Sequence, residues 1–324
     1  MNAIPFFKKA VFLDRATVDG GDLDFQALHA VASDWRYFDR TLPSETLERV
    51  GDAELVVSNK VLLERSTLEQ CRNLRLICIA ATGTNNVDLE AARALGIPVT
   101  HVAGYSTPSV VQHLFALLLT WFCRLDESRA AVRDGAWQRA EPFCLLDYPT
   151  QELPGKRLGI VGYGTLGQAV GRVAEAFGME LLLAQRPGGA AQPGRIALHE
   201  LLPQVDVLSL HCPLTAETHH LIGAAELALM RRDALLMNTA RGGIVDEQAL
   251  ADALRRGVIG GAAVDVLSSE PPREGNPLLA PDLPNLLLTP HVAWAGQPSR
   301  QRLLEEIAAN VRAFLAGEVR NRVV

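Results

Sequence analysis

The chain has 324 residues, a length that favours two domains, and its 48% hydrophobic and 21% charged residues are typical of a globular protein in water. Its formal net charge of −6 gives no electrostatic reason to expect nucleic acid or an anionic membrane as a partner. The cysteines number five and include no Cys-x-x-Cys pair, which indicates reduced thiols in a cytoplasmic protein and neither disulfides nor a metal site.

Two apolar stretches are too short or too interrupted to be a targeting or membrane segment. The N-terminal MNAIPFFKKAVFLD has no signal-peptide core, because Lys8 and Lys9 interrupt it. The most apolar run, residues 114–121, is shorter than the roughly 20 residues that a membrane-spanning helix needs. We therefore expect a cytoplasmic protein with no membrane partner.

Short apolar runs alternate with amphipathic segments along the first hundred residues. Strands are predicted at 11–14, 54–59, 75–80 and 97–102. The segments between them have helical spacing, with Ser44, Ser66 and Asp88 as N-caps and Gly96 as a stop signal. This alternation is typical of a doubly wound α/β domain with a parallel sheet.

The rest of the chain begins with one long helix and continues in a second, more regular alternation. The helix is predicted from about Ser109 to past Arg124, and an irregular arm follows at 134–155. From Lys156 onward the predicted strands are RLGIVG, ELLLAQ, VDVLSLHC, ALLMNTA, GAAVDVL and NLLLTP, and the predicted helices are 166–177, 198–204, 224–230, 247–256 and 298–318. The last helix is long enough to pack back on the first domain. We predict domains of 1–102 with 292–324, and of 103–291.

The run KRLGIVGYGTLGQAVGRVAEAFG predicts a dinucleotide site. Gly162, Gly164 and Gly167 form G-x-G-x-x-G between a predicted strand and a predicted helix. The first glycine allows the tight turn, the second lets a pyrophosphate approach the backbone, and the third lets helix and strand pack closely. The alternative is a glycine-rich turn that binds nothing, but the strand and helix around the motif favour dinucleotide binding.

The next predicted strand ends in LLLAQRPGG, without the acid that usually holds the ribose 2′-hydroxyl of NAD. Gln185 stands at that position, Arg186 follows, and no Asp or Glu occurs from Leu181 to Ile196. An arginine could bind a 2′-phosphate that a carboxylate would repel, which favours NADP(H). In the alternative interpretation, Gln185 bonds the ribose itself and Arg186 points to solvent.

Three polar residues lie at or just beyond the ends of apolar strands in the second half: Arg241, Glu270 and His291. The carboxyl ends of parallel strands face the ligand crevice, so these residues are expected to converge. An imidazolium suits proton donation to a developing alkoxide, a carboxylate would orient it, and an arginine could clamp the carboxylate of a 2-oxo acid. Alternatively, Arg241 is a structural ion-pair residue.

The sequence resembles the D-isomer-specific 2-hydroxyacid dehydrogenases over nearly its whole length. The matching stretches are ATGTNNVDL, GYSTPSVVQH, GYGTLG, HCPLTAETHHLI, MNTARGGIVDEQAL, AAVDVLSSEPP and TPHVAW. The resemblance implies a Rossmann cofactor domain inserted into a flavodoxin-like substrate domain, and Arg241, Glu270 and His291 as the catalytic trio. It also implies the cofactor and substrate contacts: Thr107, Thr165, Leu166, Cys212, Pro213, Thr239, Ala240 and Asp265 for the cofactor, and the amides of Thr82, Gly83 and Thr84 for the substrate carboxylate.

Within this family the sequence is most similar to the glycerate dehydrogenase (hydroxypyruvate reductase) branch. That branch implies reduction of hydroxypyruvate to D-glycerate. Reduction of glyoxylate to glycolate is also expected, because a hydrophobic pocket discriminates only weakly between substrates that differ by one small group. Asn59, Lys60 and Trp294 are the candidate side chains for the substrate. Members of the family usually dimerise through the cofactor domain. The alternative of another class is a dinucleotide-sensing binding protein resembling the corepressors of this fold.

Overall fold

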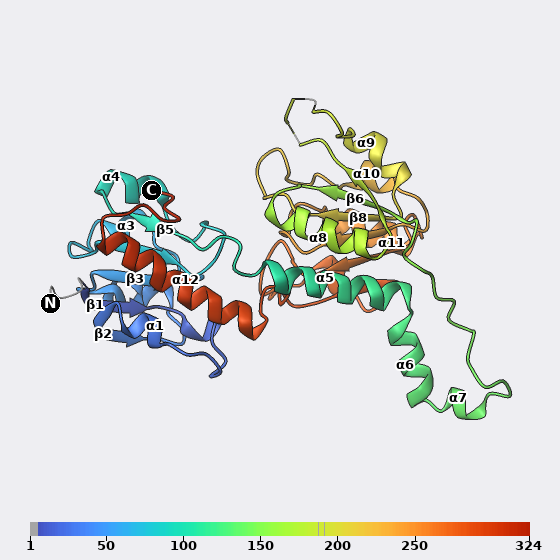
Figure 1. Ribbon diagram of the computed structural model, residues 1–324, viewed down its shortest axis with the longest axis horizontal. Helices are drawn as coiled ribbons and strands as arrows, with labels where there is room; N and C mark the ends of the chain where they lie inside the picture. The colour runs from blue at the N-terminus through green and yellow to red at the C-terminus, as the bar shows by residue number, and fades with distance from the viewer. Residues whose placement is uncertain (1–5, 187, 191) are drawn as a thin grey trace. The chain divides into compact units, whose positions relative to one another are not determined.

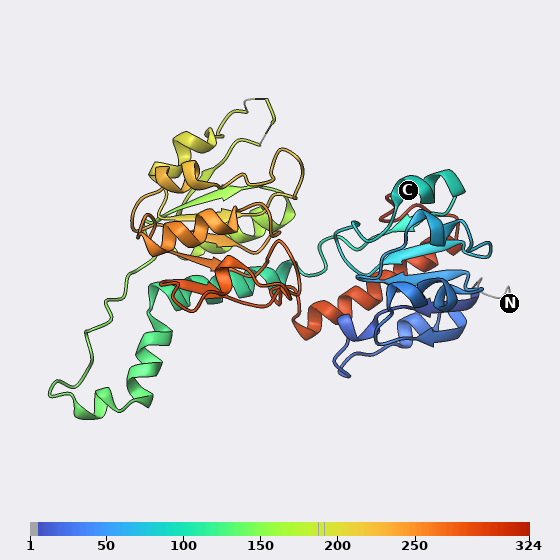
Figure 2. The same cartoon turned by 180° about the vertical axis from the view of Figure 1, so that it is seen from behind.

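The computed structural model describes residues 6–186, 188–190 and 192–324, which form two compact units. The first unit runs up to Pro108 and includes Trp294–Val324, and the second is Ser109–Ala293. The sequence predicts the corresponding changes at residues 102 and 292. Each unit is a parallel sheet with helices on both faces (Figure 1, Figure 2).

The first unit is built on a five-stranded parallel sheet with the order β2-β1-β3-β4-β5. Its strands are β1 (Phe7–Phe12), β2 (Ala32–Tyr37), β3 (Leu55–Ser58), β4 (Leu76–Ile79) and β5 (Val99–Thr100). This is the flavodoxin-like order, in which the direction of strand addition reverses between β1 and β3. Ligands of such sheets bind at the carboxyl ends of the strands, close to that reversal.

Helices cover both faces of this first sheet. The helices are α1 (Gln26–His29) and α12 (Gln297–Leu315) on one face, and α2 (Thr46–Val50), α3 (Arg65–Leu68) and α4 (Leu89–Leu95) on the other. Successive residues of one strand serve opposite faces: Leu76 packs in the cluster with α12, and Ile77 packs in the cluster with α4. The C-terminal helix thus completes the first unit, as its length predicts.

Local signals predicted some ends of these elements and missed others. Asp88 caps α4 by accepting a bond from the Ala91 amide at 2.8 Å, and Gly96 ends it in the left-handed region at φ 68°. Ser44 and Ser66 are not N-caps, because Ser44 lies inside the 3-10 helix η2 (Pro43–Glu45) and Ser66 inside α3. The edge strand β2 was not predicted, because its sequence ASDWRY carries four charged or hydroxyl side chains.

The second unit is built on a six-stranded parallel sheet with the order β11-β10-β9-β8-β6-β7. Its strands are β6 (Arg157–Val161), β7 (Glu180–Leu183), β8 (Val207–Leu210), β9 (Leu235–Asn238), β10 (Gly261–Val264) and β11 (Leu286–Leu288). An isolated parallel bridge joins Ala184 to Ile196 beyond β7. If this bridge is counted as a rudimentary third strand, the unit has the 3-2-1-4-5-6 order of dinucleotide-binding sheets, extended by β11.

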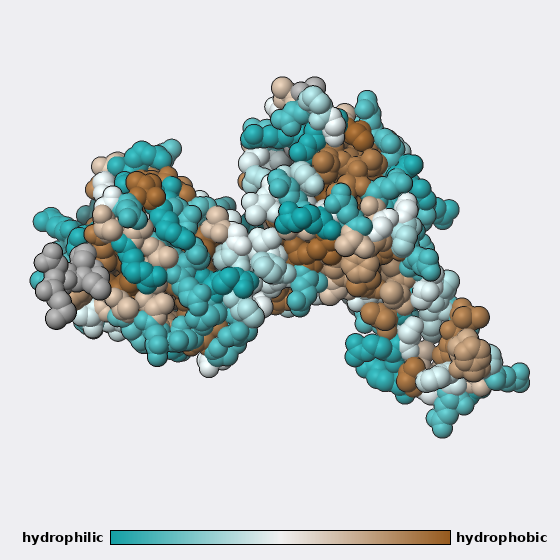
Figure 3. Space-filling view, viewed as in Figure 1, coloured by the Kyte–Doolittle hydropathy of each residue, from teal (hydrophilic) through white to brown (hydrophobic). Residues whose placement is uncertain are grey.

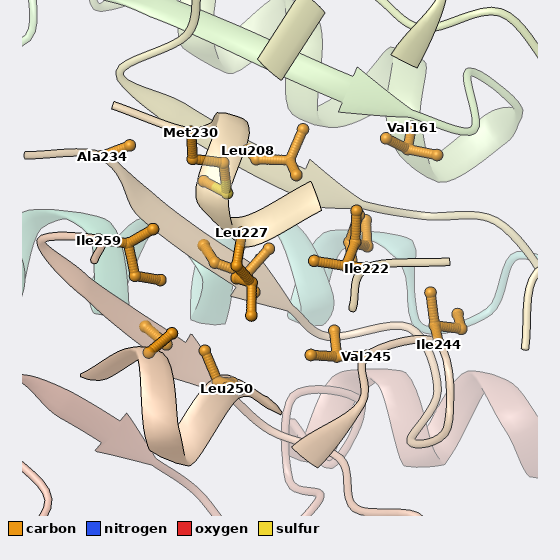
Figure 4. Packing of buried hydrophobic residues seen from close by; sticks show 14 of the residues in the cluster. Val161, Leu208, Ile222, Leu227, Met230, Ala234, Ile244, Val245, Leu250 and Ile259 are labelled. Carbon is orange, nitrogen blue, oxygen red and sulfur yellow. The ribbon is translucent and has the colours of Figure 1, made fainter. Parts of the chain in front are cut away.

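Two groups of helices sandwich the second sheet. One face carries α5 (Thr107–Phe122) and α8 (Thr165–Ala176), and the other carries α9 (Leu198–Leu201), α10 (Ala224–Leu229) and α11 (Glu247–Arg255). Along β9, Leu235 and Met237 pack toward α5 and α8, whereas Leu236 packs with α10 and α11. Figure 4 shows part of the latter cluster, where Leu227 of α10 and Leu250 of α11 lie over the sheet. The remaining 3-10 helices are η1 (Arg15–Thr17), η3 (Leu202–Gln204) and η4 (Pro277–Leu279).

The single helix predicted from Ser109 past Arg124 is wrong, because α5 ends at Phe122 and a new helix starts after a break. Arg124 has φ 50°, and its guanidinium lies 4.6 Å from the Trp121 ring centroid. The short helices α6 (Leu125–Arg133) and α7 (Ala136–Arg139), with the irregular chain that follows α7, then form an arm that leads away from α5 (Figure 1).

The apolar helix α5 raises the question of whether a helix of this chain could span a membrane. Within the described residues, no single helix is long and apolar enough to cross a membrane. The pair α5 and α6, bent by 62° at the break, meets the length and composition criteria only when the two are taken together. The apolar residues of α5, among them Leu114 and Leu118, are buried against the second sheet.

Candidate active site

The turn after β9 presents Arg241 at the carboxyl end of the second sheet. Asn238, the last residue of β9, is buried and binds the turn from both ends of its amide. Its Nδ2 donates to the Arg241 carbonyl at 2.8 Å, and its Oδ1 accepts from the Ala240 amide at 3.1 Å. The Arg241 side chain is exposed, and its Nη1 donates to the Ala240 carbonyl at 2.7 Å. Asn238 therefore fixes the backbone from which the guanidinium extends.

Gly242 brings this turn against the loop that follows β10. A Cβ added to Gly242 would lie 1.9 Å from the carbonyl carbon of Leu267, so only glycine fits there. The same loop continues to Glu270, whose Oε1 accepts a bond from the Leu267 amide at 2.8 Å. The loops carrying Arg241 and Glu270 are thus in direct backbone contact.

His291 follows β11, and its ring meets the Glu270 carboxylate. Nδ1 of His291 lies 2.5 Å from Oε2 of Glu270, and both side chains are about three-tenths exposed. His291 has φ 55°, a left-handed conformation that residues with a side chain adopt at a cost. β9, β10 and β11 are neighbours in the sheet, so the structure brings the three predicted catalytic residues to adjacent strand ends.

Asp265, predicted as a cofactor contact, is buried and binds the His291 turn with both carboxylate oxygens. Its Oδ1 accepts from the Val292 amide at 3.0 Å and from the Thr289 hydroxyl at 2.5 Å, and its Oδ2 accepts from the Ala293 amide at 2.9 Å. These bonds fix the backbone on both sides of His291. A cofactor contact of Asp265 stays a prediction.

The glycine-rich turn after β6 has the shape that a pyrophosphate needs. A Cβ on Gly162 would lie 2.6 Å from the Cys212 amide nitrogen, and one on Gly167 would lie 2.2 Å from the Gly162 carbonyl oxygen. Gly164, by contrast, has no heavy atom within 4 Å of the corresponding point. The turn is therefore tight on the protein side and open at Gly164, where α8 begins with the amides of Thr165 and Leu166.

Two buried polar atoms at the neighbouring ends of β8 and β9 have no hydrogen-bond partner in the described part of the chain: Nδ1 of His211 and Oγ1 of Thr239. Leu210 pairs with Asn238, so these residues follow directly on adjacent strands. Burial lowers the pKa of His211 to about 4, and its Nε2 lies 2.9 Å from the Ser209 hydroxyl. Polar atoms of this kind fit a bound group with hydroxyl or amide functions, as the cofactor has.

Cys212 and Pro213 follow His211 at the same edge, and Ala240 follows Thr239. Cys212 is buried, and burial raises the pKa of its thiol, so it is a packing residue and not a nucleophile. Pro213 is exposed, and its carbonyl accepts a bond from the Thr218 hydroxyl at 2.6 Å. The predicted cofactor residues of β6, β8 and β9 thus surround the point where the strand order reverses.

The loop after β7 carries the residues predicted to select the cofactor. Gln185 donates from Nε2 to the Gly189 carbonyl at 3.0 Å, so its amide closes its own loop. Arg186 is exposed. Arg195, which the sequence did not single out, places its guanidinium carbon 5.1 Å from the ring centroid of Tyr163, the residue between the first two motif glycines. Arg195 therefore lies beside the glycine-rich turn.

The residues predicted to bind substrate in the first unit lie at the carboxyl edge of its sheet. Asn59 and Lys60 follow β3, and Thr82, Gly83 and Thr84 follow β4. Asn59 donates from Nδ2 to the Thr17 hydroxyl at 3.0 Å, and Thr82 donates from Oγ1 to the Val102 carbonyl at 2.9 Å.

Buried Asp14, after β1, shapes the loop after β3, and the sequence analysis missed it. Its carboxylate accepts bonds from the amides of Asn59 at 2.9 Å, Lys60 at 2.5 Å and Val61 at 3.2 Å. Burial raises the pKa of Asp14, while these three amides act in the opposite direction. The signal was a polar residue at the end of an apolar strand, the pattern from which Arg241, Glu270 and His291 were predicted.

Thr107 and Trp294 lie at the ends of the chain segments of the first unit. Thr107 is the first residue of α5, and its amide donates to the Gly104 carbonyl at 3.3 Å. The Trp294 ring meets Tyr105 edge-on, with ring centroids 6.5 Å apart. Their predicted contacts with cofactor and substrate stay predictions.

A doubly wound unit with an open glycine turn, together with an imidazole on a carboxylate and an arginine at adjacent strand ends, defines the class of dinucleotide-dependent dehydrogenases. Comparison with known proteins identifies the family. Residues 115–293 match the family model described as D-isomer specific 2-hydroxyacid dehydrogenase, NAD binding domain. The chain belongs to this family and is an NAD(P)-dependent dehydrogenase of 2-hydroxy acids.

Individual relatives agree with this assignment over the whole chain. The chain is 43% identical over 317 residues to a glycerate dehydrogenase of Methylorubrum extorquens, covering 98% of this chain and 99% of that protein. It is 38% identical over 322 residues to a hydroxypyruvate reductase of Blautia hydrogenotrophica, covering 97% and 99%. The crystal structure of the TT0316 protein from Thermus thermophilus superimposes with a TM-score of 0.84 at 38% identity, covering 98% and 100%. The comparisons lend no support to the corepressor-like alternative.

Proposed function

We propose that this dehydrogenase reduces hydroxypyruvate to D-glycerate and, less selectively, glyoxylate to glycolate, with Arg241, Glu270 and His291 as its catalytic residues. The contact of His291 Nδ1 with Glu270 Oε2 at 2.5 Å carries the proposal, since it makes His291 an oriented acid. The names of the relatives, glycerate dehydrogenase and hydroxypyruvate reductase, support the substrate class.

The chemistry divides between the cofactor and the side chains. The bound nicotinamide supplies the hydride. His291 holds Nδ1 on Glu270, so Nε2 is the atom that delivers a proton to the developing alkoxide. Arg241 follows β9, the neighbour of β10, and its guanidinium can bind a carboxylate in a planar, two-point contact. Both oxygens of Glu270 are bonded, which keeps the imidazole from rotating.

We further propose a preference for NADP(H). The loop after β7 has no acid from Leu181 to Ile196, and Gln185 uses its amide on the Gly189 carbonyl. The loop carries two positive charges: Arg186 at its start is exposed, and Arg195 near its end lies beside the glycine turn. This arrangement supports binding of the 2′-phosphate of NADP(H). It offers fewer contacts to the unphosphorylated ribose of NAD(H).

The decisive experiment measures initial rates with hydroxypyruvate, glyoxylate and pyruvate, each with NADPH and with NADH. We expect hydroxypyruvate with NADPH to be fastest, and Arg186→Ala to raise KM for NADPH while leaving KM for NADH unchanged. His291→Ala should abolish turnover while the cofactor still binds. An NADH preference would assign the ribose contact to Gln185. Turnover in His291→Ala equal to that of the parent protein would remove His291 from the chemistry.

We also propose that the chain forms a homodimer through its second unit and resides in the cytoplasm. The arm exposes Phe143 to 90% and Leu146 to 84%, and apolar residues gather on it in Figure 3. The cysteines are free thiols, which fits a reducing compartment. Light scattering after gel filtration should give twice the 35.1 kDa of one chain. The double variant Phe143→Asp with Leu146→Asp should run as a monomer, and Leu62→Asp, at an exposed position of the first unit, should not.

A further inference from the structure

Helix α5 contacts the segment that carries His291 through two side chains of one face. Ser109 and His113 are four residues apart, so they point in the same direction from the helix. Ser109 donates from Oγ to the Ala293 carbonyl at 2.7 Å, and His113 Nε2 lies 3.0 Å from the Thr289 hydroxyl. These contacts are made on either side of His291 in the chain.

The direction of each hydrogen bond follows from the chemistry of the groups. The Asp265 carboxylate can only accept, so the single hydroxyl proton of Thr289 points to Asp265 Oδ1. The Thr289 oxygen is then an acceptor for His113, and Nε2 of His113 must carry a proton. His113 Nε2 also lies 3.6 Å from Asp265 Oδ1. The order of donation is therefore His113 to Thr289 to Asp265.

Asp265 is the point where this chain of bonds reaches the backbone of the His291 turn. Its oxygens hold the amides of Val292 and Ala293, the two residues after His291. The φ of 55° at His291 is an unfavourable conformation, and it persists only where the surroundings fix it. The contact of His291 with Glu270 depends on that conformation, because it sets the direction of the ring.

We propose that His113 is a positioning residue for His291: by fixing Thr289 and Asp265, it holds the turn in which the imidazole faces Glu270. This inference rests on the proposed role of His291 as proton donor. The ring of His113 bonds to Thr289 and lies beside Asp265, so its effect on His291 passes through the turn.

The test compares His113→Leu, which removes the donor, with His113→Gln, whose amide nitrogen keeps a donor at a similar reach. We expect His113→Leu to lower kcat for reduction about tenfold, with KM for cofactor and substrate within about twofold, because a misplaced acid slows the chemical step and leaves binding intact. His113→Gln should restore most of kcat. His199→Leu, at an exposed histidine of α9, is the matched control and should keep the parental kcat.

The outcomes separate this inference from the proposed function. An unchanged kcat in His113→Leu, while His291→Ala is inactive, overturns the inference and leaves the proposed function standing. A raised KM for cofactor at unchanged kcat, or no rescue by glutamine, likewise overturns it. If His113→Leu does not fold, Thr289→Val and Thr289→Ser decide: loss of kcat in valine with retention in serine supports the relay, and equal activities refute it.

Discussion

Glu270 and His291 form an acid–imidazole pair that ties the loop after β10 to the turn after β11. One carboxylate oxygen accepts the Leu267 amide, and the other lies 2.5 Å from His291 Nδ1. The carboxylate is therefore oriented by its own loop before it orients the imidazole. This order of support explains how an exposed loop can hold the His291 imidazole in one direction.

Replacing Glu270 by glutamine tests the charge of this pair without changing its size. Glu270→Gln can keep the Leu267 contact but no longer stabilises an imidazolium, so kcat for reduction should fall about 10- to 100-fold while KM changes little. Steady-state kinetics with hydroxypyruvate measures this. Glu274→Gln, on the exposed part of the same loop, is the control that should leave kcat unchanged. Parental kcat in Glu270→Gln would contradict the orienting role.

The rate of each reaction direction should depend on pH in opposite ways. With His291 as the proposed proton donor, reduction is expected to require the protonated ring and to slow as pH rises, whereas oxidation is expected to require the neutral ring and to become faster. Initial rates of both directions over a series of buffers of constant ionic strength measure this. A reduction rate that is flat across the series, with chemistry shown to be rate-limiting by a deuterated cofactor, would argue against His291 as the acid.

The part of the fold that the sequence predicted best depends on local signals. Asp88, a predicted N-cap, accepts a bond from the amide of Ala91, three residues ahead, and such a bond does not depend on the rest of the chain. The edge strand β2 depends instead on its backbone hydrogen bonds to β1, and this pairing cannot be predicted from the polar sequence of β2. The break at Arg124 likewise depends on packing of its side chain on Trp121.

The same distinction holds for the site. Arg241, Glu270 and His291 could be predicted because polar residues at the ends of buried parallel strands must meet at one edge of the sheet. The partnership of His113 with Thr289 joins residues 176 positions apart, and that of Arg195 with Tyr163 joins two loops, so neither leaves a local pattern.

Gly164 offers a test of cofactor binding that is separate from folding. Its φ of −81° suits any residue, and no heavy atom lies within 4 Å of an added Cβ. Gly164→Ala should therefore keep the melting temperature yet raise KM for the cofactor about 10- to 100-fold, because the methyl group occupies the approach of the pyrophosphate. Gly162→Ala is the contrasting variant: its Cβ would lie 2.6 Å from the Cys212 amide, so it should lose stability as well. Unchanged KM in Gly164→Ala would place the pyrophosphate elsewhere.

Glu217 should weaken the preference for NADP(H) that Arg186 supports. Its side chain approaches the loop after β7, where its Cγ would lie 3.4 Å from a Cβ on Gly188. The Thr215 hydroxyl lowers the pKa of Glu217, and the charge of Arg186 contributes in the same direction, so the carboxylate is ionised and opposes a nearby phosphate. Glu217→Gln should lower KM for NADPH about two- to fivefold at low salt and leave KM for NADH unchanged. Glu200→Gln, exposed on α9, is the control.

His211 should make the stability of the second unit sensitive to acid. Burial lowers its pKa to about 4, whereas the unfolded imidazole binds a proton near pH 6.5. The contribution of the neutral ring to stability is therefore fully present above about pH 6.5. It is lost as the pH falls toward 4, because the unfolded chain then binds a proton at His211 and the folded chain does not. His211→Gln can keep the Ser209 contact and does not titrate. Urea unfolding measures the free energy of unfolding at neutral pH and at about pH 4.5. The decrease between these two pH values should be smaller in this variant than in the parent protein, by on the order of 2 kcal/mol. Equal losses in the two proteins would mean that His211 is protonated in the folded state, and His199→Gln controls for removal of an exposed histidine.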